Sequence, residues 1–254
     1  MFVRPPLLLC ALCVASIHPA YAVDGKLTLA VGLDYSTGAY GESSDTETWV
    51  VPIALKYRTD DWNLRLATSW LHVTGPGNLT PEGEPLEGSS AVTTEQGAGD
   101  IIAALTYTVL DERNYPFGLD LGARIKFGTA DAAKSLGTGK NDYALQAEVF
   151  KPIDAWMPYV SLGYKWEGDP AGINYNNVWY GSAGADYRFS QTLSAGGGYD
   201  WRQKLTPTSS AVSEASLYLN YHLNDGDKFD LYLVGGFSDA SPDWGSGLIF
   251  THRF

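Results

Sequence analysis

The sequence predicts an all-β fold: a transmembrane, antiparallel, up-and-down β-barrel of about twelve strands that follows a cleaved signal peptide. Three observations lead to this prediction. Apolar residues recur at every second position over segments of about 9–11 residues, the length that crosses a bilayer at a tilt. Tight connections alternate with long polar ones, and Trp and Tyr gather at the ends of the expected strands.

Residues 1–22 have the pattern of an export signal. Arg4 supplies a positive start, Leu7 to Ile17 form a short apolar stretch, and Ala20-Tyr21-Ala22 is a small-x-small cleavage site. Both cysteines of the chain lie in this segment, so the mature chain would have no disulfide and no thiolate metal site. We therefore expect a β-barrel over residues 23–254, exported by a Gram-negative bacterium to its outer membrane.

The strand period is clear along the rest of the chain. Trp49, Val51 and Ile53 point to one face, for example, while Pro52 and Ala54 point to the other. Twelve segments show this alternation, an even number as single-chain bacterial barrels have. They lie at roughly residues 26–36, 46–58, 62–74, 98–110, 117–128, 141–152, 156–167, 177–189, 192–202, 213–223, 228–237 and 244–254.

The connections differ according to the end of the barrel to which they belong. Those after even-numbered strands are tight and carry turn residues, as in Thr59-Asp60-Asp61. The others are longer, polar and rich in Gly, Pro and Ser, and the longest covers residues 75–97. Outer-membrane barrels have short periplasmic turns and long extracellular loops. The loop 75–97 is the best candidate to fold inward as a constriction.

Alternation alone does not say which face meets lipid, because soluble sandwiches and lipocalin-like barrels alternate too. The aromatic residues favour a membrane. Trp156 and Trp166 share one face, ten residues apart, which corresponds to about 25 Å of height, the separation of the two aromatic girdles. The membrane-interface aromatics we expect, against lipid and lipopolysaccharide, are Trp49, Trp62, Trp156, Trp166, Trp179, Trp201 and Trp244.

The last strand alternates through Leu248, Phe250, His252 and Phe254. It resembles the C-terminal signal that the barrel-assembly machinery recognises, with His252 as a departure from the usual aromatic or aliphatic residue. We therefore expect that machinery as a partner, through the strand that ends in Phe254.

The face opposite the apolar one carries charges of both signs. A charge facing lipid at mid-bilayer costs about 2–4 kcal/mol for Arg or Lys, so a shared inward phase is physically required. The charges could form ion pairs that stiffen the wall, or a mixed-charge constriction that polarises a small solute. The lumen-lining candidates are Lys56, Arg65, Asp100, Asp120, Arg124, Lys126, Glu148, Lys165, Asp186, Arg188, Asp200, Arg202, Asp230 and Arg253.

Several classes of partner and activity are disfavoured. The net charge of −12 and the lack of a basic stripe argue against nucleic acid. His72, His222 and His252 have no partners at metal-ligand spacing, so we expect no metal and no cofactor. The acidic residues Glu82, Glu84, Glu87 and Glu95 are more typical of a solvated loop than of a calcium site, although they could bridge lipopolysaccharide through divalent cations.

His72 is the one residue that suggests an enzyme. Outer-membrane lipid hydrolases place a His and a Ser on the outer face, and His72 is in phase with Trp70 near an outer strand end. The segment His72-Val73-Thr74 lacks the expected serine, and a threonine hydroxyl is a poor nucleophile without a dedicated base. We expect no catalytic residues.

Residues 97–165 resemble the outer-membrane family described as "putative meta-pathway of phenol degradation". The resemblance rests on four segments: Gly97-Ala98-Gly99-Asp100, Lys126-Phe127-Gly128-Thr129, Leu136-Gly137-Thr138-Gly139 with Asp142, and Pro158-Tyr159 with Leu162-Gly163-Tyr164. The family usually has Pro where this chain has Gly128. The resemblance implies a barrel associated with uptake of small, often aromatic, compounds.

Three functions stay open on the sequence. The first is a passive channel for small organic solutes, aromatic ones among them. The second is a non-conducting structural or adhesive barrel with a packed, charged lumen. The third, and weakest, is an outer-membrane lipid hydrolase.

Overall fold

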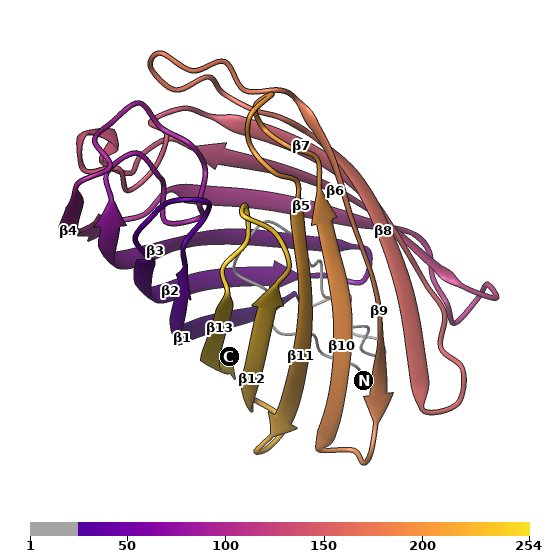
Figure 1. Cartoon of the computed structure of the whole chain (residues 1–254). Coiled ribbons are helices and arrows are strands. Elements are labelled where there is room, and N and C mark those ends of the chain that lie inside the picture. Colours follow the sequence, from indigo (N-terminus) through magenta and orange to yellow (C-terminus); the bar gives the residue numbers. More distant parts are fainter. Residues whose placement is uncertain (1–24) are drawn as a thin grey trace.

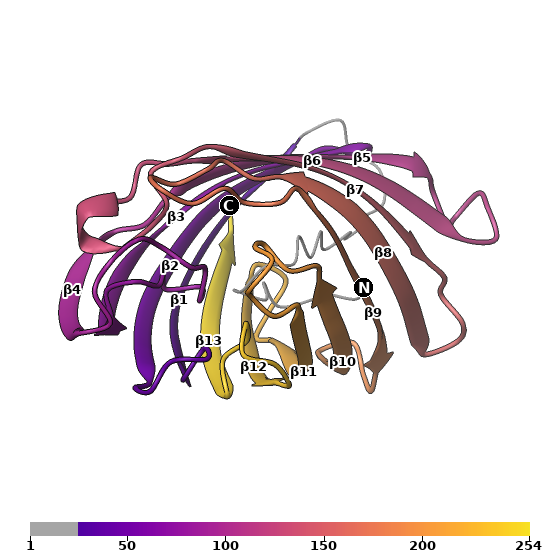
Figure 2. The same cartoon turned by 45° about the horizontal axis from the view of Figure 1, so that its top comes forward.

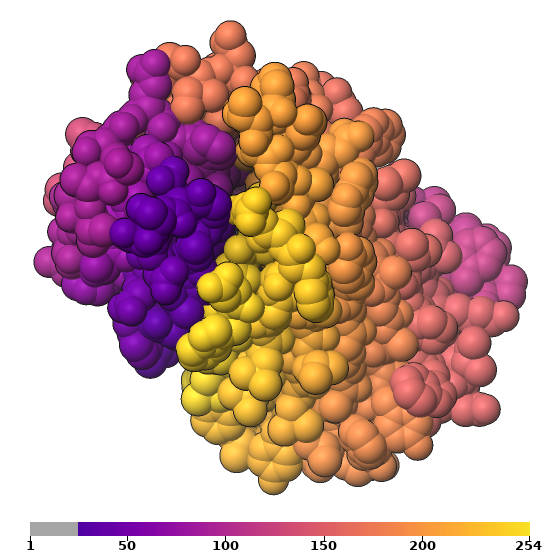
Figure 3. All heavy atoms as spheres, in the orientation of Figure 1, coloured from indigo at the N-terminus to yellow at the C-terminus, as the bar shows by residue number. Residues whose placement is uncertain are grey.

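The computed structural model describes residues 25–254 and shows one antiparallel β-barrel (Figure 1, Figure 2). Successive strands pair in sequence order, and β1 pairs with β13, so the sheet closes on itself. Figure 3 shows this closure from outside, where the indigo N-terminal part of the chain lies against the yellow C-terminal part. The predicted signal peptide, with Cys10 and Cys13, lies outside the described residues.

The wall of the barrel has twelve strands, as predicted, one of them broken into two segments. β4 and β5 are the two halves of that strand, since both pair with β3. The elements are β1 Lys26–Gly38, β2 Thr46–Arg58, β3 Trp62–Pro76, β4 Val92–Ala98, β5 Ile101–Leu110, β6 Gly118–Phe127, the short 3-10 helix η1 Ala132–Lys134, β7 Asp142–Phe150, β8 Trp156–Trp166, β9 Val178–Arg188, β10 Leu193–Arg202, β11 Val212–His222, β12 Asp227–Gly236 and β13 Trp244–Arg253.

The break between β4 and β5 is a β-bulge. Pairing with β3 stops at Ala98 and resumes at Ile102, so three residues of the broken strand oppose two residues of β3. The N–H of Gly99 still donates to the carbonyl of Ser69, at 2.8 Å, which keeps the wall hydrogen-bonded there. A bulge re-aims side chains locally, and here it presents Asp100 to the interior.

β4 was not predicted from the sequence. It extends the hairpin with β3, and the predicted loop 75–97 therefore shortens to residues 77–91. The reason for the miss is physical. The segment Thr93-Thr94-Glu95-Gln96 is polar on both faces, because this part of the hairpin has no lipid to face, so it shows no alternation of apolar and polar residues.

Short and long connections separate to opposite ends of the barrel, as predicted. The short-turn end carries turns such as 223–226, where Oδ1 of Asn224 accepts the N–H groups of Gly226 and Asp227 at 2.7 and 2.9 Å. The first residues of β1 and the last of β13 lie at this end, since Thr28 pairs with Arg253. The long-loop end carries the connections after β1, β3, β6, β8, β10 and β12.

Side chains alternate between an exposed outer face and a buried inner face. In β11, Leu217 is 66% exposed, whereas the next residue, Tyr218, is 4% exposed. Large apolar and aromatic residues cover the outside, and the buried polar residues are mostly Asp, Glu, Ser and Thr. A water-soluble barrel has the opposite arrangement, and an apolar outer surface of this extent is stable only in lipid. Among residues 25–254, no helix is both long and apolar enough to span a membrane.

Inward tyrosines lie over glycines of neighbouring strands. Tyr218 pairs with Gly196, where a Cβ would come within 2.5 Å of the Tyr218 ring. A Cβ at Gly184 or Gly198 would come within 2.6 Å of the Tyr159 hydroxyl. A larger residue at these positions would push the rings away, so the glycines let bulky side chains lie close to the wall.

Candidate solute channel and its constriction

The connection between β3 and β4, residues 77–91, folds back on itself and is largely buried at its tip; we call it the inner loop. Its base is closed by a hydrogen bond from the N–H of Gly77 to the carbonyl of Ala91, at 3.4 Å. Further along, Leu79 and Pro85 form an isolated β-bridge, and Thr80 between them is fully buried. A surface loop is ordinarily solvated, so this burial points to a loop that enters the barrel.

Glu84 of the inner loop reaches the far wall. Its Oε1 lies 3.4 Å from an Nη of Arg202 on β10 and 3.7 Å from Nζ of Lys165 on β8. Counted around the twelve-stranded wall, β10 is diametrically opposite β3, from which the loop departs. The inner loop therefore crosses the bore of the barrel at the long-loop end, as the sequence predicted for residues 75–97.

Other long connections fix the inner loop in place. The hydroxyl of Tyr175, in the connection after β8, donates to the carbonyl of Pro85 at 2.5 Å. Burial, with the neighbouring carboxylates, raises the pKa of Tyr175, so the hydroxyl stays protonated and remains a donor. On the near side, Nδ2 of Asn78 donates to Oε1 of Glu42 at 2.7 Å.

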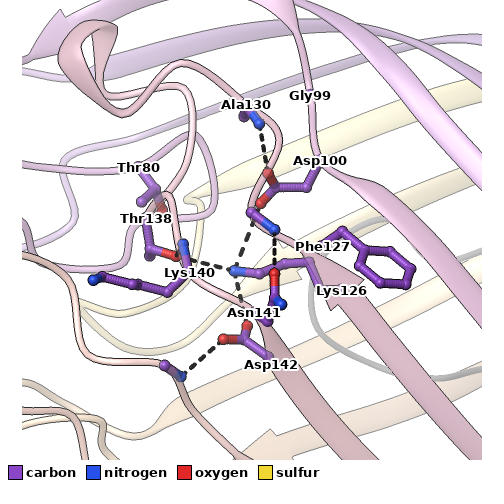
Figure 4. Close-up of polar contacts among 12 residues, drawn as sticks. Thr80, Gly99, Asp100, Lys126, Phe127, Ala130, Thr138, Lys140, Asn141 and Asp142 are labelled. Carbon is purple, nitrogen blue, oxygen red and sulfur yellow. Dashed lines mark hydrogen bonds and ion pairs between the residues drawn. The ribbon is translucent and has the colours of Figure 1, made fainter.

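An ion-pair cluster surrounds the point where Glu84 meets the wall. Asp142, at the start of β7, lies 2.8 Å from Nζ of Lys126 and 3.0 Å from Nζ of Lys165. Figure 4 shows Lys126 between Asp142 and Asp100, which is 3.7 Å from the same ammonium group. Lys165 also lies 2.7 Å from Glu167. With Glu84 and Arg202, these residues connect the inner loop to β6, β7, β8 and β10.

The connection 128–141 is held by the β-bulge and by its own first residue. The carboxylate of Asp100 accepts the N–H of Ala130 at 2.8 Å. The N–H of Gly128 donates to Oδ1 of Asn141 at 3.0 Å, and a Cβ at Gly128 would come within 2.3 Å of the backbone nitrogen of Lys140. Proline has no N–H and would occupy that space, which explains why glycine suits this chain at the position.

Further polar contacts lie lower in the barrel. Nζ of Lys228 is 2.6 Å from Asp230 near the short-turn end, and closer to mid-height the hydroxyl of Tyr232 donates to Asp34 at 2.6 Å. Carboxylates and cations therefore occupy the interior along most of its height, on strands from every side of the wall.

The predicted lumen candidates occupy inward positions with one exception. Asp120, Glu148, Asp186, Asp200, Arg202 and Asp230 are buried, and Lys56, Arg65, Asp100, Arg124, Lys126, Lys165 and Arg253 are half-buried. Arg188 is exposed, because it is the last residue of β9 at the short-turn end. The prediction missed Glu84, Asp142, Glu167 and Tyr175 as members of the site. Asp142 alone had a usable signal, since it is in phase with Ala144, Gln146 and Glu148 on β7.

The acids of the inner loop do not form one solvated group. Burial and the like charge of Glu84 raise the pKa of Glu82 to about 7. Burial acts in the same direction on Glu84, but Lys165, Lys126 and Arg202 outweigh it and hold the pKa of Glu84 below its usual value. Glu84 therefore faces the opposite wall as a carboxylate, and the sequence-based alternative of a solvated loop does not describe it.

These pKa shifts predict that the inner loop is held more weakly at higher pH. The pKa of Glu82 rises from 4.5 to about 7 in the docked loop, so the docked loop binds a proton that a released loop would lose. Docking is therefore strongest in acid and weakens as pH rises through 7. In planar bilayers, the fraction of time in a high-conductance state should be greater at about pH 8.5 than at about pH 5.5. Glu82→Gln should reduce this pH dependence, and Glu87→Gln, which changes an exposed acid of the same loop, should leave it unchanged.

His72 has no hydrolase-like surroundings. It is exposed on the outer surface, where its cross-strand neighbours are Trp49 and Gln96. The hydroxyl of Thr74 shares a 3.0 Å hydrogen bond with the hydroxyl of Thr94 rather than with His72. This geometry gives the lipid-hydrolase alternative no support. Within residues 25–254 no group of three or more His, Cys, Asp and Glu residues could hold a metal ion.

The seven predicted interface tryptophans are all exposed on the outer surface, and so is Trp70. Several pack against other aromatic rings; the centroids of Tyr35 and Trp49 lie 4.8 Å apart, and those of Trp62 and Tyr107 lie 4.6 Å apart. Such pairs form patches at both ends of the outer surface, where rings with one polar atom are stable at a lipid–water boundary.

Brominated lipids should quench most of the tryptophan fluorescence of the protein in liposomes, because all eight tryptophans are exposed on the outer surface. Bromines placed at shallow acyl positions should quench more strongly than those near the bilayer centre. Aqueous acrylamide provides the control: it should quench weakly in liposomes. The opposite pattern would place the tryptophans in a protein interior or in water.

The closed wall, the lipid-compatible outer surface and the charged interior define an outer-membrane-type β-barrel, and solved structures agree. An outer-membrane channel from Pseudomonas putida F1 matches with a TM-score of 0.70 and 16% identity, over 94% of this chain and 100% of that one. A KdgM porin in complex with disordered oligogalacturonate matches with a TM-score of 0.54 and 11% identity, over 88% and 99% of the two chains. The translocator domain of the autotransporter NalP from Neisseria meningitidis matches with a TM-score of 0.52 and 10% identity, over 92% and 90%.

The amino-acid sequence shows the family to which this chain belongs. Residues 66–254 match the model of the family described as "Putative MetA-pathway of phenol degradation", and the chain belongs to that family. The match confirms the resemblance of residues 97–165 and extends well beyond them on both sides. No curated protein matches the chain significantly in sequence.

Proposed function

We propose that the protein is a passive outer-membrane channel for small organic solutes, with the inner loop as its constriction. The observation that carries the proposal is the path of the inner loop, which leaves β3 and reaches Arg202 on the opposite wall through Glu84. A barrel that served only as an anchor would need no loop tied across its bore. The family match and the channel and porin folds among similar structures support the same function.

The proposal includes how the protein reaches its membrane. Residues 1–22 act as a cleaved signal peptide, and the strand that ends in Phe254 engages the barrel-assembly machinery. The long-loop end then faces the outside of the cell and meets lipopolysaccharide, with the short turns in the periplasm. No step of this function is enzymatic.

Planar-bilayer recording of the purified, refolded protein tests the proposal. Discrete single-channel steps are expected, together with efflux of small hydrophilic solutes from liposomes that contain the protein. A barrel that is folded, as judged by its β-type circular dichroism and altered gel mobility before heating, but gives neither steps nor efflux would refute a channel.

The ion-pair cluster favours one competing function, a non-conducting structural or adhesive barrel. Asp142, Lys126 and Lys165 satisfy one another closely, as a packed and rigid interior requires. This alternative predicts that shortening the inner loop leaves ion flow at the level of protein-free membranes.

A further inference from the structure

Five cationic side chains of the interior lie on one continuous cross-strand row. Residues that pair directly across neighbouring strands face the same side of the wall, so the register orders them. Thr28 pairs with Arg253 on one side and with Lys56 on the other, and Lys56 pairs with Arg65. The row continues through Ala104 to Arg124 and through Ala144 to Lys165. We call Arg253, Lys56, Arg65, Arg124 and Lys165 the basic row.

The basic row runs from one end of the barrel to the other. Lys56 lies near the last residue of β2, at the short-turn end, whereas Lys165 is the penultimate residue of β8, at the long-loop end. The row climbs because strands in a barrel are tilted, so a line across them winds around the axis. Successive cations are one or two strands apart, which is about 5–10 Å. Long side chains can bridge such steps.

The side chains of the row face inward. Lys56 is half-buried between Leu55 and Tyr57, which are exposed to the outside, and Arg65 is half-buried between the exposed Leu64 and Leu66.

Structural stability does not explain the row. Like charges that pair directly across strands are destabilising, and Lys56 and Arg65 form such a pair. Within the part of the chain that the structure describes, Lys56 and Arg124 take part in no ion pair of the kind that holds Lys126 and Lys165. Both cations point into the interior without such a partner, so ion pairing within the wall does not account for them.

The acidic residues are arranged differently. Asp120 and Glu148 lead through Ser161 and Ser182 to Asp200 and Glu214 along a second cross-strand row. This row lies four residues away from the basic row on each strand, as with Asp120 and Arg124 on β6, or about 13 Å. The middle of this row is uncharged because it consists of two serines, Ser161 and Ser182, whose hydroxyls share a 2.7 Å hydrogen bond. The basic row, by contrast, has a charged residue, Arg124, near mid-height.

We infer that small organic anions, carboxylates above all, are the solutes of this channel, and that they pass along the basic row. The inference rests on the proposed channel function and names its solute class. A guanidinium binds a carboxylate in a planar, bidentate manner, and a nearby lysine can accept the anion from it. Ala104 and Ala144, which separate the arginines and lysine of the row, leave space at the wall for the uncharged part of the solute.

The strip between the two rows suits the rest of such a molecule. The residues that lie between them include Thr106, Gln146 and Tyr180, which pair in one further row through Gly122 and Gly163. They offer hydroxyl, amide and aromatic surface without a charge. A benzoate-like anion would place its carboxylate on the basic row and its ring against this strip.

Bi-ionic reversal potentials in planar bilayers test the inference, with potassium benzoate or potassium chloride opposite tetraethylammonium chloride. We expect wild-type channels to prefer anions over cations and to pass benzoate. Lys56→Gln with Arg124→Gln should lower the anion-to-cation permeability ratio about threefold for each charge removed. The control for the effect of each charge is Arg113→Gln, which removes one positive charge from an arginine that is 42% exposed in the turn between β5 and β6.

The outcomes separate the two proposals. Channels that conduct but prefer cations, or whose anion preference is the same in the double variant and in Arg113→Gln, would overturn the anion inference and leave the channel intact. An absence of conductance in folded protein would refute the channel itself, and the inference with it. Benzoate block of chloride current that is weaker in the double variant would support the inference through a second readout.

Discussion

Replacement of residues 78–90 by Asn-Gly should raise the single-channel conductance several-fold. Gly77 and Ala91 already form a hydrogen-bonded pair at the base of the inner loop, and Asn-Gly is the preferred two-residue turn between such positions. The hairpin of β3 and β4 should therefore close without strain while the segment that crosses the bore is removed. Because the narrowest part of a pore dominates its resistance, removal of a crossing segment has a large effect.

A point variant provides the control for this replacement. Glu84→Gln keeps the inner loop but weakens its contacts with Lys165 and Arg202, at 3.7 and 3.4 Å. It should produce frequent transitions between the wild-type level and the higher conductance of the loop replacement. If the replacement folds normally and its conductance equals that of the wild type, the inner loop is not the constriction.

Asp142→Asn should destabilise the barrel more than any other single change in the ion-pair cluster. Its carboxylate is buried and contacts the ammonium groups of both Lys126 and Lys165. Removal of the charge leaves two lysines close together with less compensation, and loss of one partner of a buried pair costs about 3–5 kcal/mol. The free energy of unfolding, measured by urea titration of tryptophan fluorescence in liposomes or detergent, should fall by this order.

The matched variant is Asp111→Asn. Asp111 pairs with Arg113 in a turn at the short-turn end, where Arg113 is well exposed to water. Exposed pairs contribute about 0–1 kcal/mol, so the stability should change little. A further variant, Asp142→Asn with Lys126→Met, should recover part of the loss, because it removes one of the two uncompensated charges. Equal losses for Asp142→Asn and Asp111→Asn would mean that water screens the cluster as it screens a surface.

Most of the fold could be predicted from sequence because lipid imposes a strict rule on one face of each strand. Segments such as 46–58 and 156–167 alternate clearly, and their predicted bounds agree with β2 and β8 to within a residue. β4 escaped prediction because the rule does not apply where neither face meets lipid. The number of strands, the order of short and long connections and the outward position of the tryptophans all follow from the same constraint.

The site was only partly predictable, because its contacts are long-range. Glu84 meets Arg202 across 118 positions of sequence, and Tyr175 meets Pro85 across 90. Neither pair leaves a local pattern, since an acid or a tyrosine in a polar loop has the same neighbours whether the loop is solvated or folded inward. The inward phase of Lys126 and Lys165 was readable from alternation, and Asp142 shared that signal on β7, whereas Glu167, which follows the last residue of β8, became evident only with the fold.

The pairing of β1 with β13 has a consequence for the way the molecule forms. Ten residue pairs join the two strands, and they are the most distant in sequence of any neighbouring strands in the barrel. Until the final segment arrives, the sheet has two unpaired edges, each with backbone groups that can bond to another copy. Truncation within β13 should therefore give edge-to-edge aggregates rather than a smaller pore, which makes the completion of this single seam the step that commits a nascent chain to a closed ring.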